Sequence, residues 1–258
     1  AGAIGIFVFN FLERALIPFG LHHLLYSPFY YDNVVVPGGL YAYWAKLLPQ
    51  IAASTASLKS FCPEAGFTAS GFAKMFGCLG AALAFYSTAK PEKKKKVFAL
   101  LLPITLTAIV CGVTEPIEFT FLFVAPMLFV VHAFLAATLA TTMWLAGIVG
   151  INSGGLIEIA SLNLIPLMRN HWQQYLLELV IGLIFTAIWF VVFRFLILKF
   201  DFKTPGREDE AEIEFGSKEK FRNKQAEKGG KAGDPKLELC ELILEGLGGK
   251  DNIVDVTN

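Results

Sequence analysis

The stretch "CGVTEPIEFTF", from Cys111 to Phe121, interrupts the longest apolar part of the sequence. The run "VFALLLPITLTAIV" precedes it and "LFVAPMLFVV" follows it, so the carboxylates of Glu115 and Glu118 lie between two apolar segments. Pro116 disfavours helical geometry at the residue before it, which is Glu115 itself. The sequence therefore predicts that a long apolar helix breaks here, beside a carboxylate.

The composition indicates an integral membrane protein. The chain is 55% hydrophobic and 17% charged, whereas soluble domains are about 45–50% apolar and about 25% charged. Residues 97–168 carry only three charges, those of Glu115, Glu118 and Glu158. About 20 mainly apolar residues span a bilayer as a helix. A soluble protein with buried helices is the alternative, but it would need amphipathic faces, and this region shows no such period.

The character of the sequence changes at Asp201, which predicts three parts. Residues 1–200 are expected to form an all-α, multi-helix transmembrane bundle, and residues 201–234 a charged cytoplasmic linker. Residues 235–258 read as a helix that begins at Pro235 and a following strand "NIVDVTN", the start of a small α/β domain. The apolar opening without Met and the ending on a strand suggest a piece of a longer chain.

Two basic segments predict the orientation in the membrane. "AKPEKKKKV" (89–97) and "RFLILKFDFKTPGR" (194–207) are both expected on the cytoplasmic side. The net charge of zero and the absence of basic–aromatic interleaving give no sign of nucleic-acid binding. The four cysteines show no metal-binding spacing, so neither a metal nor a cofactor is expected.

A carboxylate in the bilayer interior costs several kcal/mol, so it usually faces a cavity and marks a pathway or site. Broken helices are tolerated at membrane depth only where they line such a cavity, and transporters build binding sites from them. Glu115 is therefore a candidate functional residue. The structural alternative is a glutamate in an interfacial loop that only touches water.

A second polar cluster lies in "NFLERALIPFGLHHLLYSPFYYDN" (10–33), which holds Glu13, Arg14, His22 and His23. Carboxylate, guanidinium and imidazole groups beside aromatic rings would suit a neutral polyhydroxyl ligand. The alternative is a membrane-edge ion pair with interfacial histidines, and the residues alone leave both readings open.

Three further polar residues have plainer interpretations. His132 and Glu158 stand alone in apolar sequence, which favours a structural role for each. His171 lies beside Trp172, a pairing typical of a membrane interface.

Three motifs carry a family resemblance, namely "ERALIPFGLHHLLYSPF" (13–29), "GVTEPIEFTFLFVAPMLFVVHAFLAATLAT" (112–141) and "FLILKFDFKTPGRED" (195–209). Together they resemble the sugar-transporting C component (EIIC) of the bacterial phosphoenolpyruvate-dependent phosphotransferase system (PTS), glucose superfamily. Residues 43–92 resemble its α-glucoside/maltose branch, although Ala73, Lys74 and Cys78 replace the apolar, proline-containing run of the commoner glucose-type sequences. Residues 237–258 are similar to the start of the fused B domain (EIIB).

The resemblance implies a fold and a site. The chain would be the C-terminal, sugar-binding part of EIIC, with re-entrant hairpins, and would lack most of the N-terminal dimerisation part. Glu115 would lie at a hairpin tip, facing the sugar, as substrate-binding and catalytic residue. Arg14, His22 and Thr114 would also bind the sugar, with the choice between His22 and His23 left open.

The resemblance also implies an activity in the bacterial plasma membrane. The whole protein would bind an external sugar such as maltose, carry it across, and present its 6-hydroxyl to a phosphocysteine of EIIB, as part of a sugar phosphotransferase. EIIA, phosphocarrier proteins, membrane lipid and a second copy in a homodimer would be its partners. The phosphocysteine is expected beyond Asn258, because Cys240 lies in an amphipathic helix with no adjacent cation.

Three alternatives remain open from the sequence. The same system could be specific for glucose or N-acetylglucosamine. The chain could be an ion-coupled sugar carrier with Glu115 as proton relay, or a receptor that senses sugar without moving it. A tethered phosphocarrier domain argues against the carrier, which has no need of one.

Overall fold

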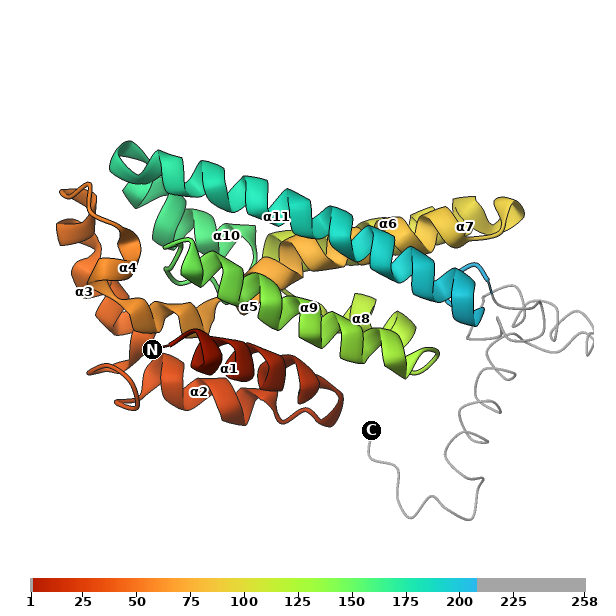
Figure 1. Cartoon of the computed structure of the whole chain (residues 1–258), viewed down its shortest axis with the longest axis horizontal. Helices are drawn as coiled ribbons and strands as arrows, with labels where there is room; N and C mark the ends of the chain where they lie inside the picture. Colours follow the sequence, from red (N-terminus) through yellow and green to blue (C-terminus); the bar gives the residue numbers. More distant parts are fainter. Residues whose placement is uncertain (1, 208–258) are drawn as a thin grey trace, which may run out of the picture. The chain divides into compact units, whose positions relative to one another are not determined.

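The computed structural model describes residues 2–207, and every regular element in this range is helical (Figure 1). This confirms the predicted all-α architecture of the membrane part. Most of the predicted linker, the helix expected from Pro235, the strand after it and Cys240 lie outside the described residues.

The described helices differ widely in length. In chain order they are α1 (Ala3–Ala15), α2 (His22–Tyr31), α3 (Gly39–Ala52), α4 (Leu58–Phe61), α5 (Ser70–Phe72), α6 (Cys78–Thr88), α7 (Lys94–Cys111), α8 (Glu115–Leu122), α9 (Pro126–Leu145), α10 (Leu156–Ile159) and α11 (Ile165–Phe200). Short 3₁₀ turns link some of them: η1 (Ile17–Phe19), η2 (Pro63–Thr68) and η4 (Pro91–Lys93). Two π-helical turns are inserted before α6 and α11: η3 (Ala73–Gly77) and η5 (Ala160–Leu164).

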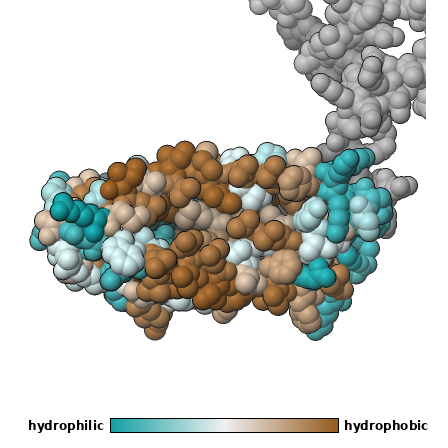
Figure 2. Space-filling view, turned by 90° about the horizontal axis from the view of Figure 1, so that it is seen from above, coloured by the Kyte–Doolittle hydropathy of each residue, from teal (hydrophilic) through white to brown (hydrophobic). Residues whose placement is uncertain are grey.

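Three helical stretches among the described residues are long and apolar enough to cross a membrane: Pro63–Thr88, Pro126–Leu145 and Leu156–Phe200. Hydrophobic side chains gather across the middle of the face seen in Figure 2, and hydrophilic ones at its two ends. This is the distribution that a bilayer about 30 Å thick requires. The prediction of a multi-pass membrane protein is confirmed.

The apolar helix breaks at the predicted place. α7 ends at Cys111, and Gly112 follows in the left-handed region with φ 78°. α8 begins at Glu115 with Pro116 in its first turn, and it has only eight residues. At about 1.5 Å per residue, α8 is too short to cross the bilayer by itself.

The break is held against a second loop, which leads into α10. A Cβ atom at Gly112 would lie 2.5 Å from the backbone N of Gly155, and one at Gly155 would lie 2.5 Å from the backbone N of Gly112. The two backbones therefore touch with no room for a side chain. Glycine is needed at Gly112 for its positive φ as well.

Small residues let the long helices approach closely. α9 packs along α1, and α6 packs along α11; the buried residues of α9 include Ala133, Ala136 and Ala140. At Gly80 of α6, a Cβ atom would lie 2.6 Å from the Cβ of Trp189 on α11. Without a strong hydrophobic drive inside lipid, such close packing is what holds membrane helices together.

The two basic segments meet at one end of the described part. The backbone N–H of Lys90 donates to Gly206 O at 3.0 Å, and Arg207 Nη1 donates to Thr88 O at 3.2 Å. The prediction that both segments lie on the same side of the membrane is consistent with these contacts. The cytoplasmic assignment of that side stays a prediction.

Asp201 ends α11 in the left-handed region, with φ 49°. Its carboxylate accepts hydrogen bonds from Lys203 Nζ at 2.7 Å and from Arg207 Nη2 at 2.5 Å. These hydrogen bonds lower the pKa of the Asp201 carboxyl.

His171 is buried, whereas its sequence position beside Trp172 suggested a membrane-interface residue. It has non-helical geometry inside α11 (φ −123°) and is buried, and its Nε2 lies 3.0 Å from Ile51 O. Trp172 next to it is exposed, as a membrane-interface residue would be. His171 therefore joins α11 to the end of α3.

Candidate functional site

A cavity of ≈ 270 Å³ lies beside the break between α7 and α8. Its lining is dominated by carboxylates, cations, imidazoles and phenols: Glu13, Glu115, Glu158, Arg14, Lys74, His22, His23, Tyr26, Tyr30, Tyr31 and Tyr41. Thr114, Ser70, Ser153 and backbone of the two glycine loops complete the wall. Its volume is close to the lower end of the range of about 300–1,000 Å³ for small-molecule sites.

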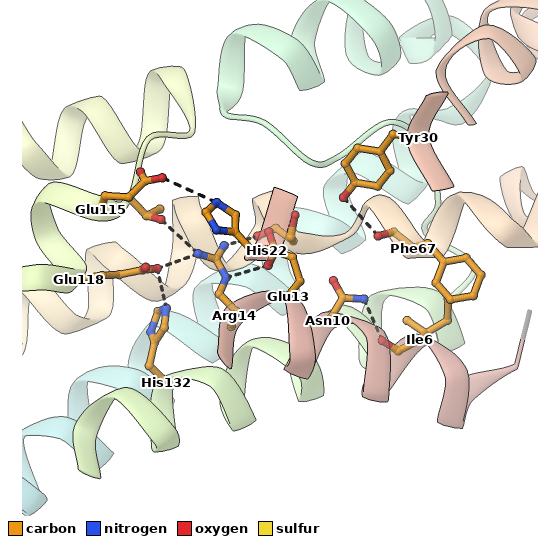
Figure 3. A network of polar contacts seen from close by, with 12 residues as sticks. Ile6, Asn10, Glu13, Arg14, His22, Tyr30, Phe67, Glu115, Glu118 and His132 are labelled. Atoms are coloured by element: carbon orange, nitrogen blue, oxygen red, sulfur yellow. Dashed lines mark hydrogen bonds and ion pairs between the residues drawn. The ribbon is translucent and has the colours of Figure 1, made fainter. Parts of the chain in front are cut away.

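The structure brings all four predicted site residues to this cavity. Arg14 comes from the end of α1, His22 from the start of α2, Thr114 from the break, and Glu115 from the start of α8. The turn "IPFG" reverses the chain between α1 and α2, because Pro18 favours a 3₁₀ turn and Gly20 takes φ 68°. The chain thus reverses, and His22 returns to the neighbourhood of Arg14 (Figure 3).

Glu115 and His22 form a loose pair at the cavity. Glu115 Oε1 lies 4.0 Å from His22 Nε2, and the Glu115 side chain is 40% exposed. His22 is buried, whereas His23 is exposed and contacts Tyr26 OH at 2.5 Å through Nδ1. Of the two histidines, His22 is the one that faces Glu115 (Figure 3).

Arg14 is buried, and both of its Nη groups donate hydrogen bonds. Its Nη1 donates to Glu118 Oε1 at 2.7 Å and to Thr114 Oγ1 at 3.2 Å, and its Nη2 donates to Ser70 O at 2.8 Å. Charge-assisted hydrogen bonds of this kind are the strong ones. Arg14 therefore ties α1 to α5, to the end of the break and to α8.

Glu118 is the residue of this site that sequence reasoning missed. It is 0% exposed, and besides Arg14 it has His132 Nε2 at 3.3 Å. An arginine in apolar membrane sequence needs a counter-ion, so Arg14 was the signal that a second carboxylate is used. Nothing in the sequence says that this partner is Glu118 rather than Glu115.

His132 is buried between Trp189 and Glu118, and these neighbours determine its tautomer. The indole N–H of Trp189 can only donate, and it donates to His132 Nδ1 at 3.1 Å. His132 Nδ1 is therefore an acceptor, so the neutral ring carries its proton on Nε2, which points at Glu118. Arg14, Glu118, His132 and Trp189 form a chain through α1, α8, α9 and α11, which we call the anchored cluster.

Glu158 lines the cavity and is bonded to the loop before α10 and to α3. Its Oε1 accepts from the backbone N–H of Gly154 at 2.5 Å and from Ser153 Oγ at 3.1 Å. Tyr41 OH donates to Glu158 Oε2 at 2.7 Å and lies 2.6 Å from Ser153 Oγ. The glycine loop before α10 is thereby fixed against α3.

Aromatic rings from "YSPFYYDN" and from α3 form one side of the cavity. Tyr26 stacks on Tyr30 with 4.8 Å between ring centroids, and Tyr31 stacks on Tyr41 with 5.2 Å between them. Rigid rings offer apolar faces and hydroxyl groups together. This combination suits a ligand with both C–H faces and hydroxyl groups.

Lys74 also lines the cavity, and the sequence analysis assigned it no role. It lies on the π-helical turn η3, and such turns are frequent at functional sites. It is one of the positions where the sequence departs from the glucose-type pattern.

The donor and acceptor set favours a neutral, hydroxyl-rich ligand. No group of three His, Cys, Asp or Glu residues within the described range 2–207 could hold a metal ion. Membrane-spanning helices around a polar cavity at a broken helix are the architecture of a membrane transport protein.

Comparison with known proteins gives the family. The family model described as "Phosphotransferase system, EIIC" matches residues 1–137, which is more than half of the chain. The chain therefore belongs to the EIIC family of the phosphotransferase system, as its motifs indicated.

Curated relatives agree with this assignment. The chain is 52% identical over 261 residues to a maltose-specific EIICB component of Bacillus subtilis, covering 100% of the chain and 50% of that protein. It is 52% identical over 264 residues to an α-glucoside-specific EIICB component of Leptotrichia buccalis, with 100% and 50% covered. A Klebsiella pneumoniae protein of the same description is 49% identical over 263 residues, with 100% and 48% covered. The chain spans about half the length of the curated relatives it matches.

Proposed function

We propose that this chain is the sugar-binding membrane part of a PTS permease that takes an α-glucoside such as maltose. The observation that carries the proposal is the polar cavity at the Gly112–Thr114 break, where carboxylate, imidazole, hydroxyl and aromatic groups converge. The names of the relatives, maltose-specific and α-glucoside-specific, support the choice of sugar.

Within this function the cavity residues have different tasks. Glu115 and His22 are loosely paired, so an acceptor and a donor are available for sugar hydroxyls. Arg14 and Thr114 are already bonded to each other. Both residues line the cavity, so they contribute to sugar binding chiefly by shaping its wall.

The proposed reaction is transfer of a phosphoryl group to the sugar. Glu115 accepts the proton of the 6-hydroxyl, the O6–P bond forms, and the S–P bond of the EIIB phosphocysteine breaks to release the thiolate. A positioned acceptor within hydrogen-bond reach is what such general-base work requires. EIIA and phosphocarrier proteins would recharge EIIB, and the full-length protein would act as a homodimer.

The experiment is competition by unlabelled sugars against labelled maltose on the purified full-length protein. Maltose is expected to compete best, glucose more weakly, and 6-deoxy analogues to bind without being phosphorylated. Glucose or N-acetylglucosamine outcompeting maltose would move the chain to those branches. No competition by any hexose or hexoside would overturn the sugar assignment.

A separate measurement distinguishes group transfer from ion coupling. Uptake into vesicles is followed with and without phosphorylated EIIB. Uptake that needs phosphorylated EIIB supports the proposal, whereas accumulation driven by a proton gradient alone would make Glu115 a proton relay.

A further inference from the structure

The carboxylates near the cavity differ in whether their oxygens already have donors. Glu118 is paired with Arg14 and His132, and Glu158 with Tyr41, Ser153 and the loop backbone. Glu115 is substantially exposed. Glu13 lines the cavity, is 2% exposed, and its Oε2 has no hydrogen-bond partner. Among the described residues, Oε2 of Glu118 and of Glu178 also lacks a partner, but neither residue lines this cavity.

Arg14 does not supply the missing donor. Its nearest atom to Glu13 is Nε, which lies 3.5 Å from Glu13 Oε2, beyond a good hydrogen bond. The Nη1 and Nη2 groups of Arg14 turn away to Glu118, Thr114 and Ser70. Figure 3 shows Arg14 between Glu118 on one side and Glu13 on the other.

The neighbours of Glu13 on α1 do not satisfy it either. Asn10, one turn earlier, donates its amide to Ile6 O at 2.8 Å. A buried carboxylate without donors is costly, and the cost is removed when donors arrive. Lys74 lines the same cavity, but no hydrogen bond joins it to Glu13, so the remaining donors are those of a molecule that enters the cavity.

We propose that Glu13 is a second sugar-binding carboxylate, which accepts hydrogen bonds from ring hydroxyls of the bound glycoside and selects for them. This inference rests on the proposed function, since it assumes a polyhydroxyl ligand. It separates the two carboxylates, with Glu115 at the reacting hydroxyl and Glu13 at hydroxyls that do not react. A site built to hydrogen-bond a hydroxyl rejects an analogue that lacks it.

Replacement of Glu13 is expected to leave the fold intact. Arg14 keeps Glu118 as its counter-ion at 2.7 Å when Glu13 is neutral. Glu13→Gln conserves the shape of the side chain and removes one acceptor oxygen and the charge. Glu92→Gln, at an exposed position far along the chain, is the matched control.

The test uses full-length protein and measures maltose affinity and phosphorylation kinetics. Glu13→Gln is expected to raise the Kd and KM for maltose about 10- to 100-fold, the effect of leaving a buried group unpaired, with kcat little changed. A panel of mono-deoxy maltoses supplies the decisive readout. At least one deoxy maltose should bind the wild-type protein more weakly than maltose does. The same deoxy maltose should bind the Glu13→Gln variant as tightly as maltose binds that variant.

The outcomes separate this inference from the proposed function. If wild-type protein binds maltose and Glu13→Gln shows the same affinity and the same deoxy penalties, the role of Glu13 is overturned while the sugar assignment stands. If wild-type protein binds no hexoside, the proposed function fails. Should Glu13→Gln not fold, Glu13→Asp is used, and an unchanged deoxy profile with unchanged affinity overturns the inference equally.

Discussion

Two glutamates three residues apart on α8 lie on two different sides of the site. Glu118 belongs to the anchored cluster, is 0% exposed, and has partners at 2.7 and 3.3 Å. The Glu115 side chain is 40% exposed, and its Oε1 lies 4.0 Å from His22 Nε2. A buried carboxylate that is paired with an arginine is suited to holding structure, whereas an exposed one with free acceptor capacity is suited to binding and proton transfer.

The same contrast explains how a rigid site keeps a reactive group. The anchored cluster ties four helices together behind the cavity wall, through Arg14, Glu118, His132 and Trp189. Thr114, the residue before Glu115, is fixed by Arg14. The position of Glu115 is thereby determined, while its carboxylate stays available. A well-supported second layer is what functional groups need for precise placement.

Glu118→Ala gives the largest expected effect, on both fold and activity. It removes the counter-ion that is hydrogen-bonded to the buried Arg14 and leaves only Glu13, 3.5 Å from Nε. Breaking a buried pair costs about 3–5 kcal/mol. Thermal unfolding in detergent should show a large fall in stability together with loss of transport. Glu115→Ala is the matched comparison and should unfold close to the wild-type temperature. Equal stability of the two variants would contradict the distinction between the two glutamates.

Glu115→Gln should affect the chemistry alone. The variant retains shape and hydrogen-bonding ability but loses the proton acceptor, so sugar phosphorylation should be abolished at wild-type expression and stability. Phosphorylation is measured with phosphorylated EIIB and labelled maltose on the full-length protein. Wild-type rates in Glu115→Gln would remove this residue from the mechanism.

Gly112→Ala should have an intermediate effect on stability. The residue needs φ 78°, and an added Cβ atom would meet the Gly154–Gly155 backbone at 2.5–2.6 Å. Strain of this kind costs of order 1–3 kcal/mol, and the displaced loops should weaken sugar binding as well. Gly5→Ala on α1, where nothing lies within 4 Å of an added Cβ, is the control and should be neutral or slightly stabilising. Equal effects at the two glycines would show that the loops do not touch.

The fold could be predicted from the sequence because its main signals are local. The apolar runs set the membrane helices, and Gly112 and Pro116 marked the break at the correct residues. The convergence of Arg14, His22 and Glu115 on one cavity was expected from the resemblance, and they do lie together. Their contact with a sugar stays a prediction.

The pairing inside the site could not be predicted, because it depends on contacts between distant positions. Arg14 and Glu118 are 104 residues apart in the chain. Sequence chemistry required a counter-ion for Arg14, but Glu13, Glu115 and Glu118 were all eligible. The choice is made by how α8 packs against α1 and α9. The same holds for Tyr41 and Glu158, 117 residues apart, and for the missing donor at Glu13.

Trp189→Phe has the smallest expected effect and tests the far end of the anchored cluster. The substitution keeps an aromatic ring in the α6–α11 contact but removes the donor to His132 Nδ1. His132 then loses the bond that holds its proton on Nε2, toward Glu118, so this contact is weakened rather than broken. Leaving the buried His132 Nδ1 without a donor costs about 1–3 kcal/mol, and the loss of ring volume adds a packing cost. Unfolding in detergent should therefore show a decrease that is smaller than for Glu118→Ala, with kcat largely retained. Trp172→Phe, at an exposed position on the same helix, is the control and should leave stability unchanged.

The sharper readout for Trp189→Phe is NMR of ¹⁵N-labelled histidine. In the wild type, His132 should be the Nε2-protonated tautomer, and in Trp189→Phe it should populate both tautomers. An Nδ1-protonated ring in the wild type would contradict the direction of the hydrogen bonds through the cluster.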